Sequence, residues 1–251
     1  MQMDITSLIG LAHYQNKNGL IVIDSPTVQK ANETVIEILM KYSDFKTALF
    51  LSGGKTPLKL YEQMASFKKI KAGAVGQVDE RFGQRFHKNS NELVLKESGI
   101  LEYFENSNMR FYPMLEEGSE IDSAARNYDE ALRFIFKYFP KSVGIMGMGS
   151  DGHTAGIPAI PEICKKMMED QSSLVSFYEA EKYGARITMN FNALSMLDLI
   201  IVLVLGQEKR AMLSELFKSG GSIEDIEKFP GKFYLKPEIA AKTILITDQM
   251  I

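Results

Sequence analysis

A glycine-rich turn directly follows a short apolar run near the middle of the chain. The run covers residues 143–146, and the turn, residues 147–154, reads Gly-Met-Gly-Ser-Asp-Gly-His-Thr. Glycine permits positive backbone torsion angles and lets the main chain approach a ligand closely. A turn of this kind at the end of a buried strand presents Asp151 and His153 at the edge of a sheet. A carboxylate and an imidazole in such a position are suited to acid–base chemistry.

Short apolar runs alternate with helical segments along much of the chain. Ser25-Pro26 and Thr56-Pro57 are each typical of a helix N-cap followed by the first helical residue. The alternation favours parallel pairing, so we expect one α/β domain over residues 1–251, with a single Rossmann-like, mostly parallel sheet and helices on both faces. Ligands of such sheets bind beyond the carboxyl ends of the strands. The expected strands are residues 20–23, 48–51, 110–113, 142–146, 174–178, 186–189, 199–205 and 243–246, and the expected helices include residues 26–42, 121–138 and 207–217.

The composition excludes several classes of protein. The chain carries 29 Lys and Arg against 32 Asp and Glu, so it has no overall basic field for nucleic acid or an anionic membrane. The single cysteine, Cys164, cannot form an internal disulfide, which suits a reducing compartment. Residues 1–20 lack the pattern of a signal peptide, and the longest apolar run, residues 199–205, is too short to span a membrane. We therefore expect a cytoplasmic protein without nucleic-acid or membrane partners, either a monomer or a small homo-oligomer.

The segment Ser52-Gly53-Gly54-Lys55-Thr56 joins an expected strand to a helix N-terminus. Free backbone N–H groups and the positive end of the helix dipole favour an anion such as phosphate there. The spacing of glycines and lysine is not that of a Walker A loop, so a nucleoside triphosphate is not implied. The alternative is an ordinary tight turn capped by Thr56, and the local sequence leaves both interpretations open.

Charged residues follow the apolar stretch at residues 76–78. Asp79-Glu80-Arg81 lies at a strand end in this interpretation, and His87 and Asn91 belong to the same connection. This number of polar groups directly after a strand indicates a site, because ligands bind beyond the carboxyl ends of strands. The alternative is a solvated charge run, which is the usual fate of such a triplet. His87 alone is more typical of a hydrogen-bonded structural residue than of a catalyst.

His153 is the strongest candidate for a general base. An unperturbed imidazole has a pKa of about 6.5 and therefore accepts a proton near neutrality. Asp151 could orient that imidazole or hold a substrate hydroxyl. One alternative is a capping histidine in a glycine turn. Another is zinc binding by Asp151 and His153, for which the sequence offers no obvious third ligand.

Two cations complete the candidates. Arg186 begins an expected strand, and Lys209 lies in the first turn of an expected helix. Either residue alone would be an ordinary surface cation. A cation early in a helix opposes the helix dipole, so Lys209 has an unfavourable position that a bound phosphate would offset.

Taken together, these segments resemble the 6-phosphogluconolactonases, within the wider superfamily that includes glucosamine-6-phosphate deaminase. Any one of the motifs is weak, but together and in the right order they are highly specific. The resemblance covers most of the chain. The similar segments are residues 51–57, a phosphate loop; residues 78–91, an Asp-Glu-Arg segment with a following His and Ser-Asn; residues 147–155, the glycine turn; residues 186–188; and residues 206–209.

The resemblance implies hydrolysis of 6-phospho-D-glucono-1,5-lactone to 6-phosphogluconate in the pentose phosphate pathway, with no metal or other cofactor. His153 would take a proton from the attacking water, and Asp151 would orient His153 or a sugar hydroxyl. Arg81 would stabilise the developing oxyanion or contact the substrate, and Asp79 is the further catalytic candidate. The expected substrate- and phosphate-binding residues are Ser52, Gly53, Gly54, Lys55, Thr56, His87, Arg186 and Lys209.

The chain departs from the pattern of each branch of the superfamily. The deaminase branch usually has Asp-Glu-Tyr in place of residues 79–81 and an Asn-Glu-Pro close behind its Asp-Gly-His, which is missing here. The lactonases commonly continue their turn with Ser-Leu-Phe-Pro, whereas this chain has Gly-Ile-Pro-Ala at residues 156–159, and Asn89 stands where Asp is common. These departures concern the shape of the sugar pocket. Two alternatives stay open: a glucosamine-6-phosphate deaminase/isomerase in which Asp79 moves a proton at C2, and a non-catalytic sugar-phosphate-binding protein.

Overall fold

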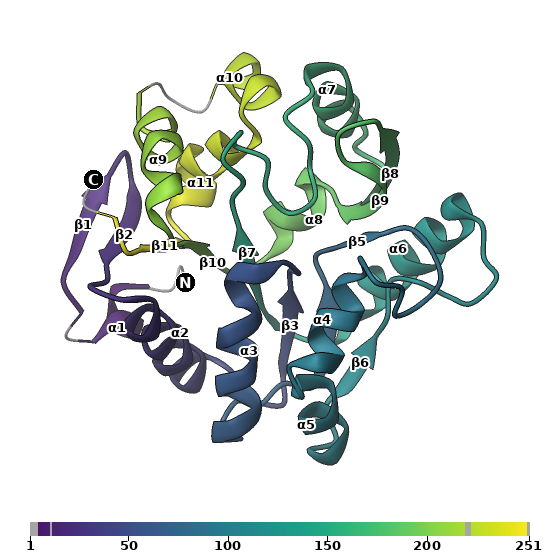
Figure 1. Cartoon of the computed structure of the whole chain (residues 1–251), viewed down its shortest axis with the longest axis horizontal. Coiled ribbons are helices and arrows are strands. Elements are labelled where there is room, and N and C mark those ends of the chain that lie inside the picture. The colour runs from purple at the N-terminus through teal and green to yellow at the C-terminus, as the bar shows by residue number, and fades with distance from the viewer. Residues whose placement is uncertain (1–4, 11, 219–221, 250–251) are drawn as a thin grey trace.

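An eight-stranded, mostly parallel β-sheet forms the centre of the molecule (Figure 1). This computed structural model describes residues 5–10, 12–218 and 222–249. Neighbouring strands are parallel except at one edge, where β1 and β2 form an antiparallel hairpin. The predicted fold class is therefore confirmed. Across the sheet, the strands are β1 (Tyr14–Lys17), β2 (Leu20–Asp24), β11 (Thr243–Thr247), β10 (Leu199–Val204), β7 (Lys141–Gly147), β3 (Thr47–Leu51), β4 (Ala74–Gln77) and β6 (Arg110–Tyr112).

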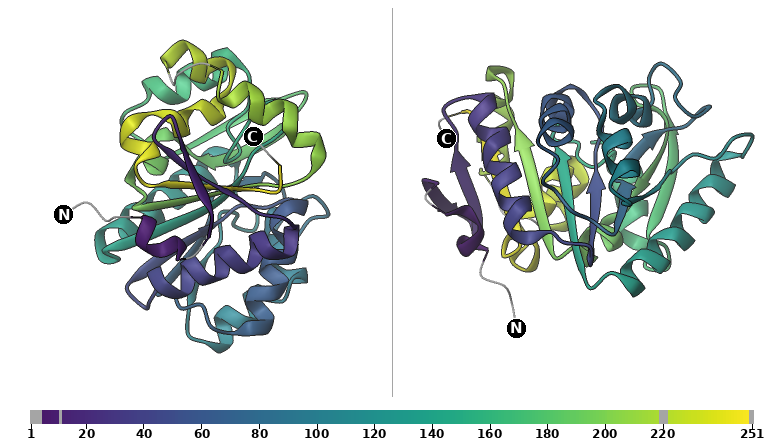
Figure 2. Two further views of the ribbon diagram at one scale, coloured as in Figure 1. Left: turned by 90° about the vertical axis from the view of Figure 1, so that its left-hand side faces the viewer. Right: turned by 90° about the horizontal axis from the view of Figure 1, so that it is seen from below.

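Helices cover both faces of this sheet (Figure 2). The sequence of strand β10 is continuously apolar because both of its faces are buried. Leu199, Ile201 and Leu203 pack into one core cluster, and the residues between them pack into the other. On one face lie α1 (Thr6–Ile9), α2 (Val28–Tyr42), α3 (Lys55–Phe67), α4 (Asn91–Glu97) and α5 (Ile100–Asn106). On the other lie α6 (Ile121–Tyr138), α7 (Pro161–Glu169), α8 (Phe191–Met196), α9 (Arg210–Leu216), α10 (Ile223–Lys228) and α11 (Pro237–Ala240), with the 3₁₀ turns η1 (Gln207–Lys209) and η2 (Pro230–Leu235).

A second sheet of three antiparallel strands stands apart from the first. It consists of β5 (Asp79–Arg81), β9 (Gly184–Met189) and β8 (Val175–Ala180), with β9 in the middle. The expectation that residues 174–178 and 186–189 join a single parallel sheet is therefore wrong. The physical reason is the short connection at residues 181–183, because two strands joined by so few residues can pair only as an antiparallel hairpin.

Three helices begin at other residues than the sequence predicts. Helix α2 starts at Val28, because the side chain of Thr27 rather than Ser25 accepts the capping hydrogen bond, from the Lys30 amide. Helix α3 starts at Lys55 instead of Pro57, with Gly54 as its N-cap at a φ of 99°. The helix expected over residues 207–217 is a 3₁₀ turn followed by α9, which begins at Arg210.

The order of the strands reverses between β3 and β7. From β3 the chain runs outward to β4 and β6, whereas from β7 it runs in the opposite direction to β10 and β11. The connections that leave β3 and β7 therefore diverge to opposite faces, which opens a crevice beyond their carboxyl ends. The loop at residues 52–54 and the glycine turn at residues 147–154 both leave strands at this point.

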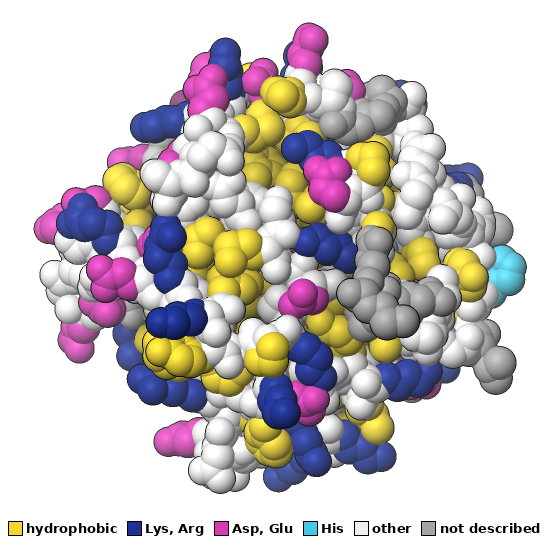
Figure 3. Space-filling model, turned by 180° about the vertical axis from the view of Figure 1, so that it is seen from behind, with side chains coloured by type: hydrophobic (Ala, Val, Ile, Leu, Met, Phe, Trp, Pro, Cys, Tyr) yellow, Lys and Arg dark blue, Asp and Glu magenta, His cyan; other side chains and the backbone are white. Residues whose placement is uncertain are grey.

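No helix of the described residues is long and apolar enough to cross a membrane. On the face of the molecule shown in Figure 3, hydrophobic side chains form separate patches among Lys, Arg, Asp and Glu side chains.

A buried carboxylate connects the small sheet to helix α4. The side chain of Glu80, in β5, is fully buried, and burial raises its pKa, an effect that hydrogen bonds to its oxygens oppose. Because every neighbour donates, an ionised carboxylate fits the site. The donors are Gln77 Nε2, Ser90 Oγ and the backbone amides of Arg81, Asn91 and Glu92, at 2.6–3.1 Å.

Replacing Glu80 by Gln would retain the shape of the side chain but turn one acceptor oxygen into a donor that faces other donors. We expect the free energy of unfolding to fall by about 1–3 kcal/mol, the usual cost of unsatisfied buried polar groups. Urea unfolding of both proteins would measure the difference. The control is Glu33→Gln, which removes an exposed ion pair with Lys30 and should change the value by less than about 1 kcal/mol. Equal losses in the two variants would contradict this role of Glu80.

Candidate active site

Loops from both sheets converge on a cavity of about 200 Å³ at the point where the strand order reverses. An adjoining cavity of about 420 Å³ shares Gly54, Arg81 and Arg186 with it. The predicted site residues that line the first cavity are Ser52, Gly53, Gly54, Thr56, Asp79, Arg81, His153, Arg186 and Lys209. Asp151 and His87 lie outside this lining, and the side chain of Lys55 lies outside the described part of the structure.

The loop after β3 offers backbone N–H groups at the start of α3. Gly54 adopts a φ of 99°, a conformation that favours glycine, and this turns the chain into the helix. Gly53 packs so closely on Asn91 that an added Cβ would lie 1.9 Å from its Oδ1 atom. The hydroxyl of Ser52 is buried and has no hydrogen-bond partner among the described residues. This unpartnered hydroxyl and the helix N-terminus together suit an anion.

The glycine turn after β7 holds His153 against Asp151. The Nδ1 atom of His153 lies 2.6 Å from Asp151 Oδ1, which also accepts the His153 amide at 3.2 Å. Gly149 makes this compact turn possible, since an added Cβ there would lie 2.1 Å from the imidazole. Of the two side chains, only His153 lines the cavity, so Asp151 reaches the cavity only through His153.

Asp151 is held as an anion by its neighbours. Partial burial alone would raise the pKa of this carboxyl group, but hydrogen bonds from Lys182, Tyr183 and His153 outweigh burial and hold the pKa well below its usual range. An ionised Asp151 can only accept hydrogen bonds, so His153 donates from Nδ1, and in the neutral imidazole Nε2 is left without a proton.

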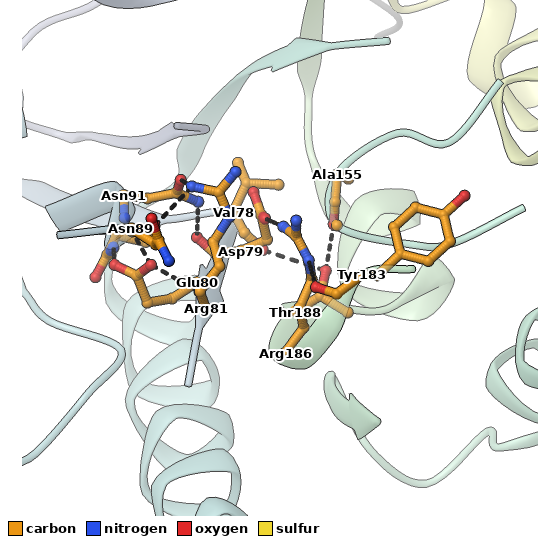
Figure 4. A network of polar contacts seen from close by, with 12 residues as sticks. Val78, Asp79, Glu80, Arg81, Asn89, Asn91, Ala155, Tyr183, Arg186 and Thr188 are labelled. Atoms are coloured by element: carbon orange, nitrogen blue, oxygen red, sulfur yellow. Dashed lines mark hydrogen bonds and ion pairs between the residues drawn. The ribbon is translucent and has the colours of Figure 1, made fainter. Parts of the chain in front are cut away.

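Two arginines from the small sheet face the cavity. Arg81 of β5 and Arg186 of β9 are direct partners in the antiparallel ladder, so their side chains leave the same face of the sheet. Like charges in this arrangement repel each other. Asp79 offsets part of the repulsion, because its Oδ2 atom accepts a hydrogen bond from Arg186 Nη1 at 2.9 Å (Figure 4).

Arg81 is fixed by the connection that leads into α4. Its Nη1 atom donates to the Asn89 carbonyl at 2.9 Å and to Asn91 Oδ1 at 2.7 Å (Figure 4). His87 supports the same loop from outside the cavity, with Nε2 at 3.0 Å from the Arg81 carbonyl oxygen. The structure therefore does not bring His87 to the cavity, and its observed contacts are those of a structural residue.

Lys209 reaches the cavity from the turn after β10. It ends η1 and directly precedes α9, and the turn begins at Gly206, whose φ is 105°. The Gly206 amide donates to Asp248 Oδ1 at 2.9 Å, which fixes the start of the turn. Among the described residues no carboxylate forms an ion pair with Lys209, so its charge is open to a ligand.

Sequence reasoning missed two residues at this site, Lys182 and Tyr183, and gave a third, Asn91, no role of its own. Asn91 lines the cavity and donates from Nδ2 to the Asp79 carbonyl at 2.8 Å. Tyr183 and Lys182 both donate to Asp151 from the turn between β8 and β9. The Ser-Asn dipeptide before α4 was a signal for Asn91, whereas no local pattern shows that the turn at residues 181–183 reaches Asp151. Within the described residues, no group of three or more His, Cys, Asp or Glu side chains could hold a metal ion.

Comparisons with known proteins agree with the fold and with the motifs. A 6-phosphogluconolactonase of Helicobacter pylori is 27% identical over 195 residues, which are 76% of this chain and 80% of the relative. The solved 6-phosphogluconolactonase of Plasmodium vivax has a TM-score of 0.76 at 18% identity, with 98% of this chain and 95% of that chain covered. A monomeric glucosamine-6-phosphate deaminase has a TM-score of 0.70 at 14% identity, with 90% and 96% covered. At such identities the two solved structures show a shared fold alone.

A family model settles the relationship that the motifs indicate. Residues 25–237 match the model described as glucosamine-6-phosphate isomerases/6-phosphogluconolactonase. The matched range includes every predicted site residue, from Ser52 to Lys209. The chain therefore belongs to the glucosamine-6-phosphate isomerase/6-phosphogluconolactonase family.

Proposed function

We propose that this protein hydrolyses 6-phospho-D-glucono-1,5-lactone to 6-phosphogluconate. The observation that carries the proposal is one cavity that combines an imidazole held by a carboxylate with three cations and a helix N-terminus. Curated relatives from Helicobacter pylori and Thermotoga maritima are named 6-phosphogluconolactonases, which supports the same assignment. Because the lining draws on elements from β3 to η1, we propose that a single domain carries the activity.

The phosphate of the substrate binds between the start of α3 and the turn after β10. Backbone amides of the loop at residues 53–56 and the unpartnered Ser52 hydroxyl donate hydrogen bonds to its oxygens. Arg186 and Lys209 add charge-assisted contacts. Binding of the phosphate at this fixed point orients the lactone ring relative to His153.

His153 acts as the general base. Its Nε2 atom takes a proton from water as the water oxygen attacks the lactone carbonyl, and the carbonyl becomes a tetrahedral oxyanion. When the bond between the carbonyl carbon and the ring oxygen breaks, the proton passes from His153 to the departing ring oxygen, which becomes a hydroxyl. Asp151 stabilises the imidazolium between these two steps.

Arg81 stabilises the oxyanion, because its guanidinium is already fixed by Asn89 and Asn91 at the cavity wall. Asp79 holds Arg186 in place through their ion pair, which is how it contributes to catalysis. The same carboxylate would be the base at C2 in a deaminase/isomerase, so the two activities need a direct assay.

The test of the proposed function is a pH-stat assay with freshly prepared 6-phosphogluconolactone, from which spontaneous hydrolysis is subtracted. We expect acid release above the spontaneous rate and no ammonia from glucosamine 6-phosphate. Ammonia release without lactone hydrolysis would replace the proposal with the deaminase. Binding of the lactone without turnover would replace it with a non-catalytic binding protein.

Replacing His153 by Ala removes the general base, so we expect kcat for the phosphorylated lactone to fall roughly 10²- to 10⁴-fold. The same pH-stat assay measures the change. His13→Ala is the matched control, because His13 is an exposed histidine just before β1 at the edge of the large sheet, and it should leave kcat unaltered. An unchanged kcat in His153→Ala would reject the assigned role.

Replacing Lys209 by Ala removes one cation from the phosphate site, so we expect KM for the phosphorylated lactone to rise roughly 10- to 100-fold with a smaller change in kcat. Steady-state kinetics with phosphorylated and unphosphorylated gluconolactone would measure it. Lys228→Ala serves as the control, since Lys228 is an exposed lysine paired with Glu224 on α10. A Lys209→Ala variant that loses as much activity on the unphosphorylated lactone would contradict the phosphate contact.

A further inference from the structure

Tyr183 occupies the turn between β8 and β9 and touches the catalytic pair directly. Its hydroxyl donates to Asp151 Oδ2 at 2.6 Å. Its ring packs edge-on against the His153 imidazole, with 5.5 Å between the ring centroids and an interplanar angle of 81°. Tyr183 therefore contacts both members of the pair: it forms a hydrogen bond with Asp151 and packs against His153.

The Tyr183 hydroxyl is itself fixed by the segment in which this chain departs from its family. The backbone amide of Ala159 donates to that hydroxyl at 3.3 Å. A hydroxyl that accepts one hydrogen bond donates more strongly to the next group, so this contact reinforces the bond to Asp151. Partial burial and the hydrogen bond to Asp151 raise the pKa of Tyr183, so the phenol keeps the proton that it donates.

Lys182 is the other donor to the same carboxylate oxygen, but it holds Asp151 less firmly. The Lys182 side chain is 65% exposed, whereas that of Asp151 is 27% exposed. Solvent screens an exposed ion pair, and the flexible lysine loses side-chain entropy when it forms one. Tyr183 is half-buried and rigid, so it is the stronger constraint on the position of Asp151.

We propose that Tyr183 is a positioning residue for the His153–Asp151 pair. This inference rests on the proposed function, because His153 must be the general base for its orientation to matter. The Tyr183 hydroxyl fixes one oxygen of Asp151, the other oxygen accepts the proton of His153 Nδ1, and Nε2 is held toward the cavity without a proton.

The backbone of the same residue holds the phosphate-binding arginine. The carbonyl of Tyr183 accepts a hydrogen bond from Arg186 Nε at 3.2 Å (Figure 4). Figure 4 also shows the ring of Tyr183 extending away from Arg186. A substitution of the side chain leaves the carbonyl in place, so loss of the hydroxyl should affect the proton-transfer step and leave phosphate binding intact.

The test is Tyr183→Phe, which keeps the ring against His153 and removes only the hydroxyl. In steady-state assays with the phosphorylated lactone we expect kcat to fall roughly 10-fold, the scale of one lost hydrogen bond to a charged group, with KM within about twofold. Lys182→Gln should lower kcat by less than about threefold, because it removes an exposed pair. Tyr103→Phe is the matched control, since Tyr103 on α5 also donates its hydroxyl, to the carbonyl of Ile70, away from the cavity.

A second measurement does not depend on activity. The chain has only three histidines, so ¹⁵N-edited NMR of the imidazoles, assigned by the signal that His153→Gln removes, reports the tautomer of His153. In the unsubstituted protein we expect the Nδ1–H form with a protected, downfield proton. In Tyr183→Phe we expect that proton signal to broaden and the Nε2–H form to become populated, and in Tyr103→Phe we expect neither change.

The outcomes separate this proposal from the proposed function. An unaltered His153 tautomer and an unaltered kcat in Tyr183→Phe would overturn the positioning role. A larger fall in kcat for Lys182→Gln than for Tyr183→Phe would also overturn it, because the lysine would then be the principal constraint. An unsubstituted protein without lactonase activity would refute the proposed function, whereas the NMR comparison would still test whether Tyr183 orients His153.

Discussion

The buried carboxylate of Glu80 is the interaction on which the geometry of the site depends. Taking an ionised group out of water is unfavourable unless its oxygens are fully hydrogen-bonded, and here they accept from β4, β5 and the start of α4. The bonds to the Ser90 hydroxyl and the Asn91 amide fix the N-terminus of α4. Asn91 in turn binds Arg81 and the carbonyl of Asp79. The position of Arg81 at the cavity wall therefore depends on a charge in the interior.

The two sheets contribute different parts of the site. The parallel sheet provides the crevice between β3 and β7, and the glycine loops and the N-terminus of α3 lie at this crevice. The antiparallel sheet provides Arg81 and Arg186, which its ladder register forces onto one face. Such a pair of like charges is unfavourable in the free protein, and Asp79 relieves it only in part. A bound anion would relieve it further, so the protein holds its positive charges in place before the ligand arrives.

Much of the fold and most of the cavity lining could be predicted from the sequence. The strands of the parallel sheet are continuous apolar runs because both faces are covered, and their carboxyl ends carry the polar motifs. Residues 175–189 form a separate antiparallel hairpin because too few residues connect β8 and β9 for parallel pairing. This short connection decides how the two strands pair, although strands alternate with helices elsewhere in the chain. Helix α3 begins at Lys55 because a positive φ at its N-cap, Gly54, turns the chain there, although Thr56-Pro57 is also a good start signal. The contact of Tyr183 with Asp151 could not be predicted from the sequence. Tyr183 lies in a turn with exposed neighbours, and the sequence of that turn does not indicate the loop on which the turn packs.

The segment that follows His153, residues 155–159, is held by close contacts like the rest of the site. Ala155 and Gly156 both have positive φ values, 52° and 72°, an uncommon conformation for the alanine. The carbonyl of Ala155 accepts the hydroxyl of Thr188, and an added Cβ on Gly156 would lie 2.4 Å from Asp79. The turn is therefore pressed against β5 and β9, and it then directs the Ala159 amide to Tyr183. The turn thus supplies a backbone hydrogen bond to the Tyr183 hydroxyl, which in turn donates to Asp151, so the main chain after the glycine turn also supports the carboxylate.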